Sequence, residues 1–338
     1  MLELIAERID QMIQLDVASR NVIQTIYPIA RQHAGRPLAM LAAERLHKQV
    51  KPKDVVFIAT GWPDRPHITP EIAETDGPPG AAVLARALHI GLNCVPIVLI
   101  EEHLVPAMKI VLEATGLRVV RPEEAIKAIT SSAPIHAAAV IGFPSDKTEA
   151  ERKAKELVDA YQPAALVVVE KGGMNEQETI HTSRGADTTE HMAKVDYLVK
   201  ELNKRGVLTI GIGDGGNEVG MGTIASELKR IIPYGEKCLC GCGGGITPCV
   251  PTDVLVAASI SNWGAYGVAA CLALLTKNLN VFHDEALEER LLARSADAQL
   301  IDGITGYVMP SADGLDVSVH KAFVKVMREV VIQGMRFV

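Results

Sequence analysis

The chain has 338 residues, of which 48% are apolar and 22% are charged, a composition typical of a globular protein and unlike that of a disordered chain. Its formal net charge is −7, and it has no run of Lys and Arg and no basic stripe interleaved with aromatic residues, which argues against nucleic-acid binding. No apolar stretch reaches the ~20 residues that span a bilayer, and the first residues resemble neither a signal peptide nor a transit peptide, so we expect a cytoplasmic protein without membrane contacts.

The first fifty residues have a helical pattern. Apolar residues from Leu4 to Val17 recur at steps of three and four, which predicts an amphipathic helix. A second helix is expected over residues 37–50. We therefore interpret residues 1–50 as an N-terminal helical extension and residues 51–338 as a single α/β catalytic domain. The apolar face of the first helix is a candidate interface for a homodimer.

From residue 51 onward, short β-type runs alternate with helical segments. Strands are expected at residues 55–59, 95–100, 117–120, 137–143, 165–169, 207–212 and 254–260. Helices are expected at residues 81–92, 106–115, 147–161, 188–205, 224–232, 266–276, 283–295 and 316–335. Residues 121–135 are a candidate hinge. This alternation predicts a doubly wound α/β fold, in which a mainly parallel sheet carries helices on both faces.

Polar residues and glycine follow four of the expected strands. The loops concerned contain Thr60 and Asp76; Glu170, Lys171, Asn175, Arg184 and Asp187; Asp214, Asn217 and Glu218; and Ser261 and Asn262. Sheets of this class bind their ligands outside the carboxyl ends of the strands. An ordinary turn or helix cap explains any one of these loops, but the agreement of four separate segments predicts a small-molecule site at this edge.

Residues 211–222 contain six glycines together with Asp214, Asn217 and Glu218, directly after an expected strand. Gly-x-Gly-x-x-Gly matches the dinucleotide fingerprint literally, but the acidic residue required about twenty positions further on is missing. A phosphate-binding loop of the Walker type is disfavoured further, because the segment lacks the Gly-Lys-Ser/Thr ending. Carboxylates beside a carboxamide suit a divalent cation such as Mg²⁺ or Mn²⁺, or general acid–base chemistry.

Four of the six cysteines are clustered in one glycine-rich segment, whereas Cys94 and Cys271 are expected in the core. The clustered residues are Cys238, Cys240, Cys242 and Cys249. Their spacing differs from the paired CxxC of common zinc sites, which favours incidental thiols over a soft-metal site or a reactive thiol. The histidines form no metal-binding motif, and those near the expected site are interpreted as surface or capping residues: His67, His181 and His191.

Several of these segments together resemble the D-glutamate cyclase family. The resemblance rests chiefly on residues 211–222, and it is supported, in the family's order, by Thr75-Asp76-Gly77-Pro78, by Glu170 with Gly173 and Asn175, by Arg184 with Asp187, and by Ser261-Asn262-Trp263-Gly264. It extends from residue 35 to residue 330. It implies an α/β fold and the interconversion of D-glutamate and 5-oxo-D-proline with loss or gain of water. The chain departs from the family's pattern at Cys238–Cys249 and at Lys171, where Arg is more usual.

The implied reaction assigns a hypothetical role to each polar group. Acid–base catalysis is expected from Asp214, Glu218 and Asn217. Substrate contacts are expected from Arg184 or Lys171, which would pair with its carboxylate, and from Gly215, Gly216, Asn175, Ser261 and Asn262. A Mg²⁺ or Mn²⁺ ion would be held by Asp76, Glu170, Asp187, Asp214 and Glu218. Two other functions stay open: a non-catalytic sensor of an acidic metabolite, and a metal-dependent hydrolase of another lactam.

Overall fold

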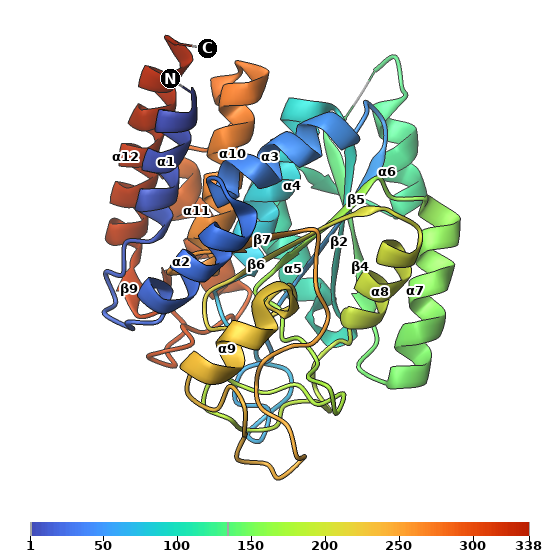
Figure 1. The fold of residues 1–338 in the computed structure, drawn as a ribbon. Helices are drawn as coiled ribbons and strands as arrows, with labels where there is room; N and C mark the ends of the chain where they lie inside the picture. Colours follow the sequence, from blue (N-terminus) through green and yellow to red (C-terminus); the bar gives the residue numbers. More distant parts are fainter. Residues whose placement is uncertain (1, 134, 338) are drawn as a thin grey trace.

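The structure is a computed structural model that describes residues 2–133 and 135–337. The structure does not describe residues 1, 134 and 338. They fall, in that order, within the predicted extension at 1–50, the predicted hinge at 121–135 and the predicted domain at 51–338. Seven strands form one sheet in the order β3-β4-β2-β1-β5-β6-β7, and every neighbouring pair is parallel (Figure 1). The doubly wound α/β fold predicted from the sequence is therefore confirmed.

The strands are short, and most are apolar along their whole length because both faces of the sheet are covered. They are β1 Val55–Thr60, β2 Val95–Glu101, β3 Arg118–Val119, β4 Ala137–Phe143, β5 Ala165–Val169, β6 Leu208–Gly213 and β7 Val254–Ala257. A separate antiparallel hairpin, β8 Ser311–Ala312 and β9 Leu315–Asp316, lies near the C-terminal helix. Its turn contributes to the site described below.

Alternate side chains of β1, β2, β4 and β5 enter two different cores. In β1, Val56 and Ile58 belong to the first core, whereas Phe57 and Ala59 belong to the second. Helices of the first core are α1 Leu2–Ile13, α2 Ile23–Ala34, α3 Leu38–Gln49, α4 Pro78–Leu92, α5 Val105–Glu113, α9 Ala225–Ile231, α10 Ser261–Thr276, α11 Glu285–Asp297 and α12 Val317–Met335. Helices of the second core are α6 Pro122–Ile129, α7 Lys147–Tyr161 and α8 Asp196–Lys204.

The N-terminal helices are joined to one another through a buried carboxylate. Asp10 of α1 accepts hydrogen bonds from the Tyr27 hydroxyl of α2 and from the backbone N–H of Leu38 at the start of α3. The apolar face of α1, with Ile5 and Ile9, is buried in the first core of the same chain. Homodimerisation through this helix stays a prediction. Among the described residues, no helix combines the length and apolar character needed to cross a membrane.

Four expected elements differ clearly from the observed ones. The helix predicted over residues 188–205 begins only at Asp196, because the apolar residues before it enter the second core from a loop. The candidate hinge is wrong in its first half: α6 begins at Pro122 and has a capping box, which favours a helix start. The last expected strand ends at Ala257, and α10 begins at Ser261, five residues earlier than the predicted residue 266.

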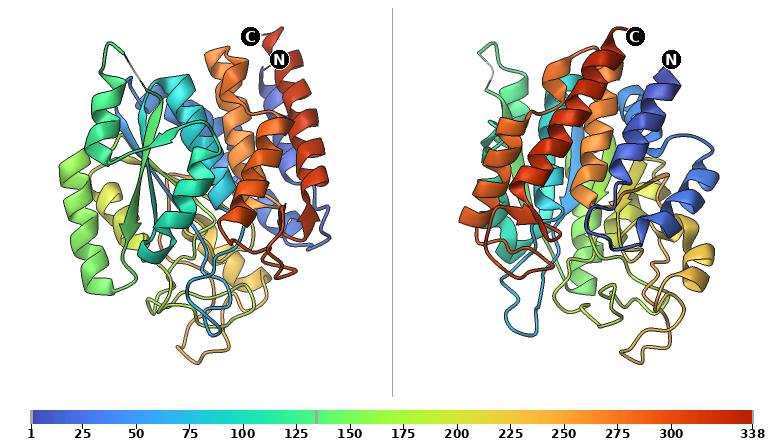
Figure 2. Two further views of the ribbon diagram at one scale, coloured as in Figure 1. Left: turned by 180° about the vertical axis from the view of Figure 1, so that it is seen from behind. Right: turned by 90° about the vertical axis from the view of Figure 1, so that its left-hand side faces the viewer.

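The order of the strands identifies where a ligand is expected. The chain adds strands on one side of β1 up to β4, and then crosses to the other side to form β5. Ligands of doubly wound sheets bind at the carboxyl ends of the strands beside such a crossing. The loops that follow β1, β5 and β6 gather at this end of the sheet, away from the chain termini (Figures 1 and 2).

Candidate active site

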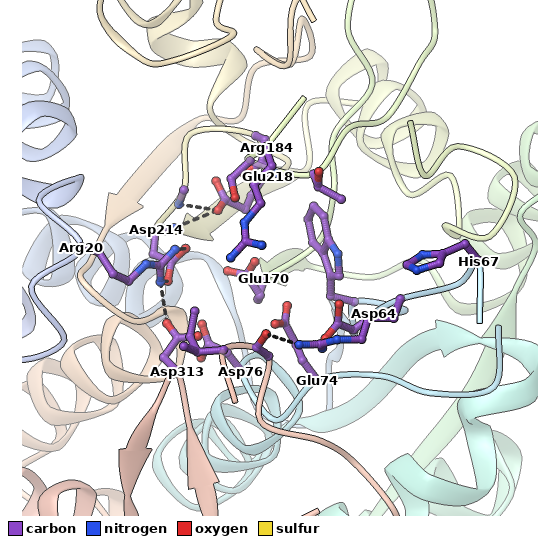
Figure 3. A pocket seen from close by; sticks show the side chains of 18 of the residues that line it. Arg20, Asp64, His67, Glu74, Asp76, Glu170, Arg184, Asp214, Glu218 and Asp313 are labelled. Atoms are coloured by element: carbon purple, nitrogen blue, oxygen red, sulfur yellow. Dashed lines mark hydrogen bonds and ion pairs between the residues drawn. The ribbon is translucent and has the colours of Figure 1, made fainter. Parts of the chain in front are cut away.

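A cavity of about 380 Å³ lies among these loops, within the size range of small-molecule sites (Figure 3). Its lining is dominated by charged and polar side chains from loops far apart in the sequence. The lining residues are Arg20, Trp62, Asp64, Arg65, His67, Ile68, Glu74, Asp76, Glu170, Thr182, Ser183, Arg184, Asp214, Gly215, Asn217, Glu218, Gly303, Ile304 and Asp313.

Three buried carboxylates form the centre of this cavity. Asp76 precedes α4 in the loop after β1, Glu170 follows β5 directly, and Asp214 follows β6 directly. One oxygen atom of each lies within 4.8 Å of an oxygen of the others. The structure thus brings together three side chains that the sequence predicts as metal ligands. We call Asp76, Glu170 and Asp214 the acidic cluster.

The start of α10 holds two members of the acidic cluster. The carboxylate of Asp76 accepts hydrogen bonds from the backbone N–H groups of Ser261 (2.9 Å) and Asn262 (2.8 Å). The Ser261 hydroxyl donates to Glu170 at 2.5 Å, and Glu170 itself has the left-handed φ of 44°, a strained conformation common at functional sites. Ser261 and Asn262, predicted as substrate contacts, are not among the lining residues and instead position these carboxylates.

The glycine-rich turn is closed by its own glutamate. The Glu218 carboxylate accepts hydrogen bonds from the backbone N–H groups of Asp214 (3.2 Å), Gly215 (2.5 Å) and Gly216 (2.9 Å). A Cβ atom at Gly213 would lie 2.8 Å from this carboxylate, which explains why glycine is needed there. The N–H groups of Gly215 and Gly216, predicted to face an oxyanion, are therefore already occupied by Glu218.

Two residues in the ion-pair network of Asp214, namely Arg20 and Asp313, have no counterpart among the predicted ones. Arg20, between α1 and α2, places one guanidinium nitrogen 2.6 Å from Asp214 and 2.6 Å from Asp313 (Figure 3). The charge of Asp214 raises the pKa of Arg20, so the guanidinium stays protonated. Asp313 lies in the β8–β9 turn. A single Arg in a polar loop and an Asp-Gly turn are common features, so the sequence held no signal for either.

Burial makes the site favour protons or a cation. It is the main cause that raises the pKa of Asp76 to about 7 and that of Glu218 to about 7, and the negative charge of Asp214 adds to both shifts. The pKa values of Glu170 and Asp313 are also raised, mainly by burial and then by neighbouring carboxylates. Carboxylic acids that hold a proton near neutral pH are suited to general acid catalysis.

Comparison with known proteins identifies the family of the chain. A family model described as "D-glutamate cyclase-like, C-terminal" matches residues 9–328. The chain belongs to this family. The chain is also similar to the mitochondrial D-glutamate cyclase of Homo sapiens, with 29% identity over 222 residues. This alignment covers 65% of the chain and 33% of the human protein, so the chain spans about a third of that relative's length.

Other predicted site residues of this cyclase-like chain lie elsewhere. Lys171 is fully buried, forms an ion pair with Glu101 and donates to the Gly61 carbonyl, so it is not free to bind a substrate. Asn175 donates to the Gly245 carbonyl and holds the cysteine-containing loop. The exposed carboxylate of Asp187 accepts hydrogen bonds from the backbone N–H and the hydroxyl of Thr189. Lys171, Asn175 and Asp187 do not line the cavity.

Arg184 is the cation best placed for a substrate. Its exposed side chain extends into the cavity (Figure 3), and it makes no hydrogen bond or ion pair with any other residue that the structure describes. Asn217 also lines the cavity, although its amide donates to the His181 carbonyl at 2.8 Å. His67 lies at the exposed rim. His181, interpreted above as a surface or capping residue, is instead buried beside the cysteine loop.

Proposed function

We propose that the chain interconverts D-glutamate and 5-oxo-D-proline plus water in this cavity, as a carbon–oxygen lyase. The observation that carries the proposal is the buried acidic cluster opposite an unpaired Arg184, within a chain of the D-glutamate cyclase-like family. The name of the human relative supports the same substrate. An arginine suits the α-carboxylate of an amino acid because it forms two parallel hydrogen bonds.

The reaction forms one bond and breaks one bond. The α-nitrogen attacks the γ-carboxyl carbon, the new C–N bond closes the ring, and a C–O bond breaks to release water. The ammonium group gives up two protons in the process, and the leaving oxygen gains two, so no proton is consumed overall. The protein therefore needs one group that accepts a proton from nitrogen and one that delivers a proton to oxygen.

The acidic cluster supplies a group for each transfer. Asp214, paired with the Arg20 guanidinium, would accept a proton from the ammonium group as a carboxylate. Glu170 has a raised pKa through burial and nearby negative charge, and would deliver a proton to the leaving oxygen. In the reverse direction the two roles exchange. Enclosing the substrate in a folded conformation also lowers the entropic barrier to ring closure.

A divalent cation fits the same three side chains. Asp76, Glu170 and Asp214 offer the oxygen atoms that Mg²⁺ and Mn²⁺ prefer, and their other contacts already orient them. Such an ion would take the place of the Glu170 proton, because a cation and a proton compete for the same carboxylates, and would polarise the γ-carboxyl group instead. Asp187 and Glu218 would not join this ion shell, because Asp187 is exposed outside the cavity and Glu218 binds three backbone N–H groups.

An NMR time course tests the proposal directly. Purified protein is incubated with 5-oxo-D-proline, with its L-enantiomer or with D-glutamate, each with and without Mg²⁺ or Mn²⁺. We expect D-glutamate to form from the D-lactam alone and the reverse reaction to reach the same equilibrium ratio. If neither enantiomer reacts but either one raises the melting temperature, the cavity belongs to a binding protein and the proposed reaction is wrong. If neither enantiomer reacts, a panel of other lactams is incubated in the same way, and turnover of any of them would indicate a hydrolase of different specificity.

A further inference from the structure

A second group of side chains lies beside the cavity and takes no part in the proposed reaction. His181, Cys238, Cys240 and Cys242 each direct one donor atom toward the others, and all four atoms lie within 4.8 Å of one another. The Cys238 Sγ is 3.3 Å from that of Cys240 and 3.5 Å from that of Cys242. The His181 Nε2 is 3.3 Å from Cys240 Sγ and 3.7 Å from Cys242 Sγ. We call these four residues the thiol cluster.

We propose that the thiol cluster binds one Zn²⁺ ion as a closed, structural site. Three thiols and one imidazole form a common tetrahedral donor set for zinc. Zn–S and Zn–N bonds of normal length separate tetrahedral donors by about 3.6–3.8 Å. Four of the six donor–donor separations, at 3.3–3.7 Å, differ from these values by a few tenths of an ångström, and the other two are within 4.8 Å. Small movements of the side chains would therefore place all four donors around one ion.

The local backbone brings the three sulfur atoms to one side of the loop. Gly241 and Gly243 have φ values of +82° and +88°, which turn the chain after Cys240 and again after Cys242. The Cys242 sulfur also accepts hydrogen bonds from the Asn175 amide and the Gly244 N–H. Hydrogen bonds of this kind orient metal ligands and stabilise thiolates. Asn175, predicted as a substrate contact, thus has a role in this cluster.

The fourth ligand is distant in the sequence, which explains why the spacing of the cysteines alone does not indicate a zinc site. His181 precedes Cys240 by 59 residues and reaches the cysteine loop from the segment after β5. Its Nδ1 atom is buried without a hydrogen-bond partner among the described residues. The neighbours of its other ring nitrogen, Nε2, are the sulfur atoms of Cys240 and Cys242. Cys249, which belongs to the same cysteine-rich segment, lies outside the cluster.

The ion would also fix one wall of the cavity. The residues that follow His181 directly, Thr182, Ser183 and Arg184, line the cavity, and the His181 carbonyl accepts a hydrogen bond from Asn217. The Leu239 N–H donates to the Gly185 carbonyl, which ties the cysteine loop to the same segment. With four protein ligands the site has no open position, so its role is to hold this wall and not to activate water.

The first test measures metal binding by the wild-type chain. The protein is purified without added metal and analysed for zinc, then stripped and titrated with Co²⁺. We expect one zinc per chain, and with Co²⁺ an intense tetrahedral visible spectrum together with sulfur-to-cobalt charge transfer. A folded chain that contains no zinc and shows no charge-transfer band with Co²⁺ would overturn the proposal. This result does not depend on whether any variant folds, nor on whether the cyclase activity exists.

The second test uses matched cysteine variants. Cys240→Ser removes a ligand at an exposed position, and Cys249→Ser removes a thiol from the same segment outside the cluster. We expect Cys240→Ser to weaken zinc affinity by more than about 100-fold and to reduce the charge-transfer intensity by about a third, since loss of an outer-shell partner alone costs 10–100-fold. Cys249→Ser should retain the wild-type affinity and spectrum. Equal losses in both variants would contradict the assignment of these ligands.

Discussion

The acidic cluster and the thiol cluster lie at the same end of the sheet, but they are held in different ways. Asp76, Glu170 and Asp214 come from three separate loops, and each has protein partners: backbone N–H groups, a serine hydroxyl or the Arg20 guanidinium. The cysteines come from one short loop, and their sulfur atoms lie mainly against each other and His181. The fold therefore positions the acidic cluster in advance, whereas in our proposal a bound ion positions the thiol cluster.

Because of this difference, we expect the arrangement of the two clusters to depend differently on a bound metal ion. The carboxylates are positioned by strand ends and by the start of α10, so their arrangement does not need a cation. The cysteine loop has no strand or helix of its own over residues 235–249, and in our proposal the zinc ion supplies the missing order. Removal of zinc should therefore disturb the cavity wall near Arg184 and leave the acidic cluster in place.

The largest expected effect is on catalysis by the acidic cluster. Asp214→Asn keeps the size of the side chain but removes the charge that pairs with Arg20 and the proposed proton acceptor. We expect kcat to fall by about 10²–10⁴-fold, the usual contribution of a positioned acid or base. Rates of D-glutamate formation measured by NMR, with circular dichroism to verify folding, test this prediction.

Asp187→Asn is the matched control for this change. Asp187 was also expected from the sequence to bind the metal, but it is exposed and lies outside the cavity. We expect its substitution to change kcat less than twofold, in line with the small effects of surface substitutions. A loss of activity in Asp187→Asn equal to that in Asp214→Asn would mean that the cavity identified here is not the reaction centre.

Much of the fold and the acidic cluster could be predicted because they follow from local patterns. Buried parallel strands are continuous apolar runs, and the expected strand 165–169 and helix 147–161 agree with β5 and α7 at both ends. Asp76, Glu170 and Asp214 could be found because each lies in a polar loop after a strand. Parallel strands then bring those loops to the same edge.

The remaining site residues depend on tertiary contacts that leave no local pattern. Arg20 reaches the cavity from the predicted N-terminal extension, and Asp313 from a hairpin near the other end of the chain. Lys171 follows Glu170 directly, but its side chain is buried against Glu101. A sequence shows that a charged residue follows a strand, but it does not show on which side of the loop that residue points.

The second expected effect concerns substrate binding by Arg184, on the wall that connects the two clusters. Arg184→Gln removes an exposed, unpaired cation, so we expect KM to rise by about 10–100-fold, the value of one or two charge-assisted hydrogen bonds. The melting temperature should not change. Lys171→Met should show the opposite pattern, with lower thermal stability and unchanged KM, because it leaves Glu101 buried without its partner. Unchanged KM in Arg184→Gln would show that the substrate carboxylate binds elsewhere.

The smallest expected effect is the part of the pH dependence of stability that belongs to Asp76. Burial raises the pKa of Asp76 from 3.8 to about 7, so the folded state binds its proton more tightly than the unfolded state does. The stabilisation is fully present below about pH 4 and is lost as the pH rises to about 7. The charged groups that act on Asp76 include Glu74, Glu170, Asp214, Asp313 and Arg20.

Urea unfolding of the zinc-loaded protein between pH 5 and pH 8 measures this slope. We expect the wild-type free energy of unfolding to fall by about 2–3 kcal/mol more than that of Asp76→Asn over this range. Mn²⁺ should restore part of the loss at pH 8 and have little effect at pH 5, because a cation and a proton compete for the same carboxylates. An equal response to Mn²⁺ in wild type and Asp76→Asn would contradict a cation site here. The acidic cluster would then bind protons and no cation, and the thiol cluster would be the one metal site proposed for the chain.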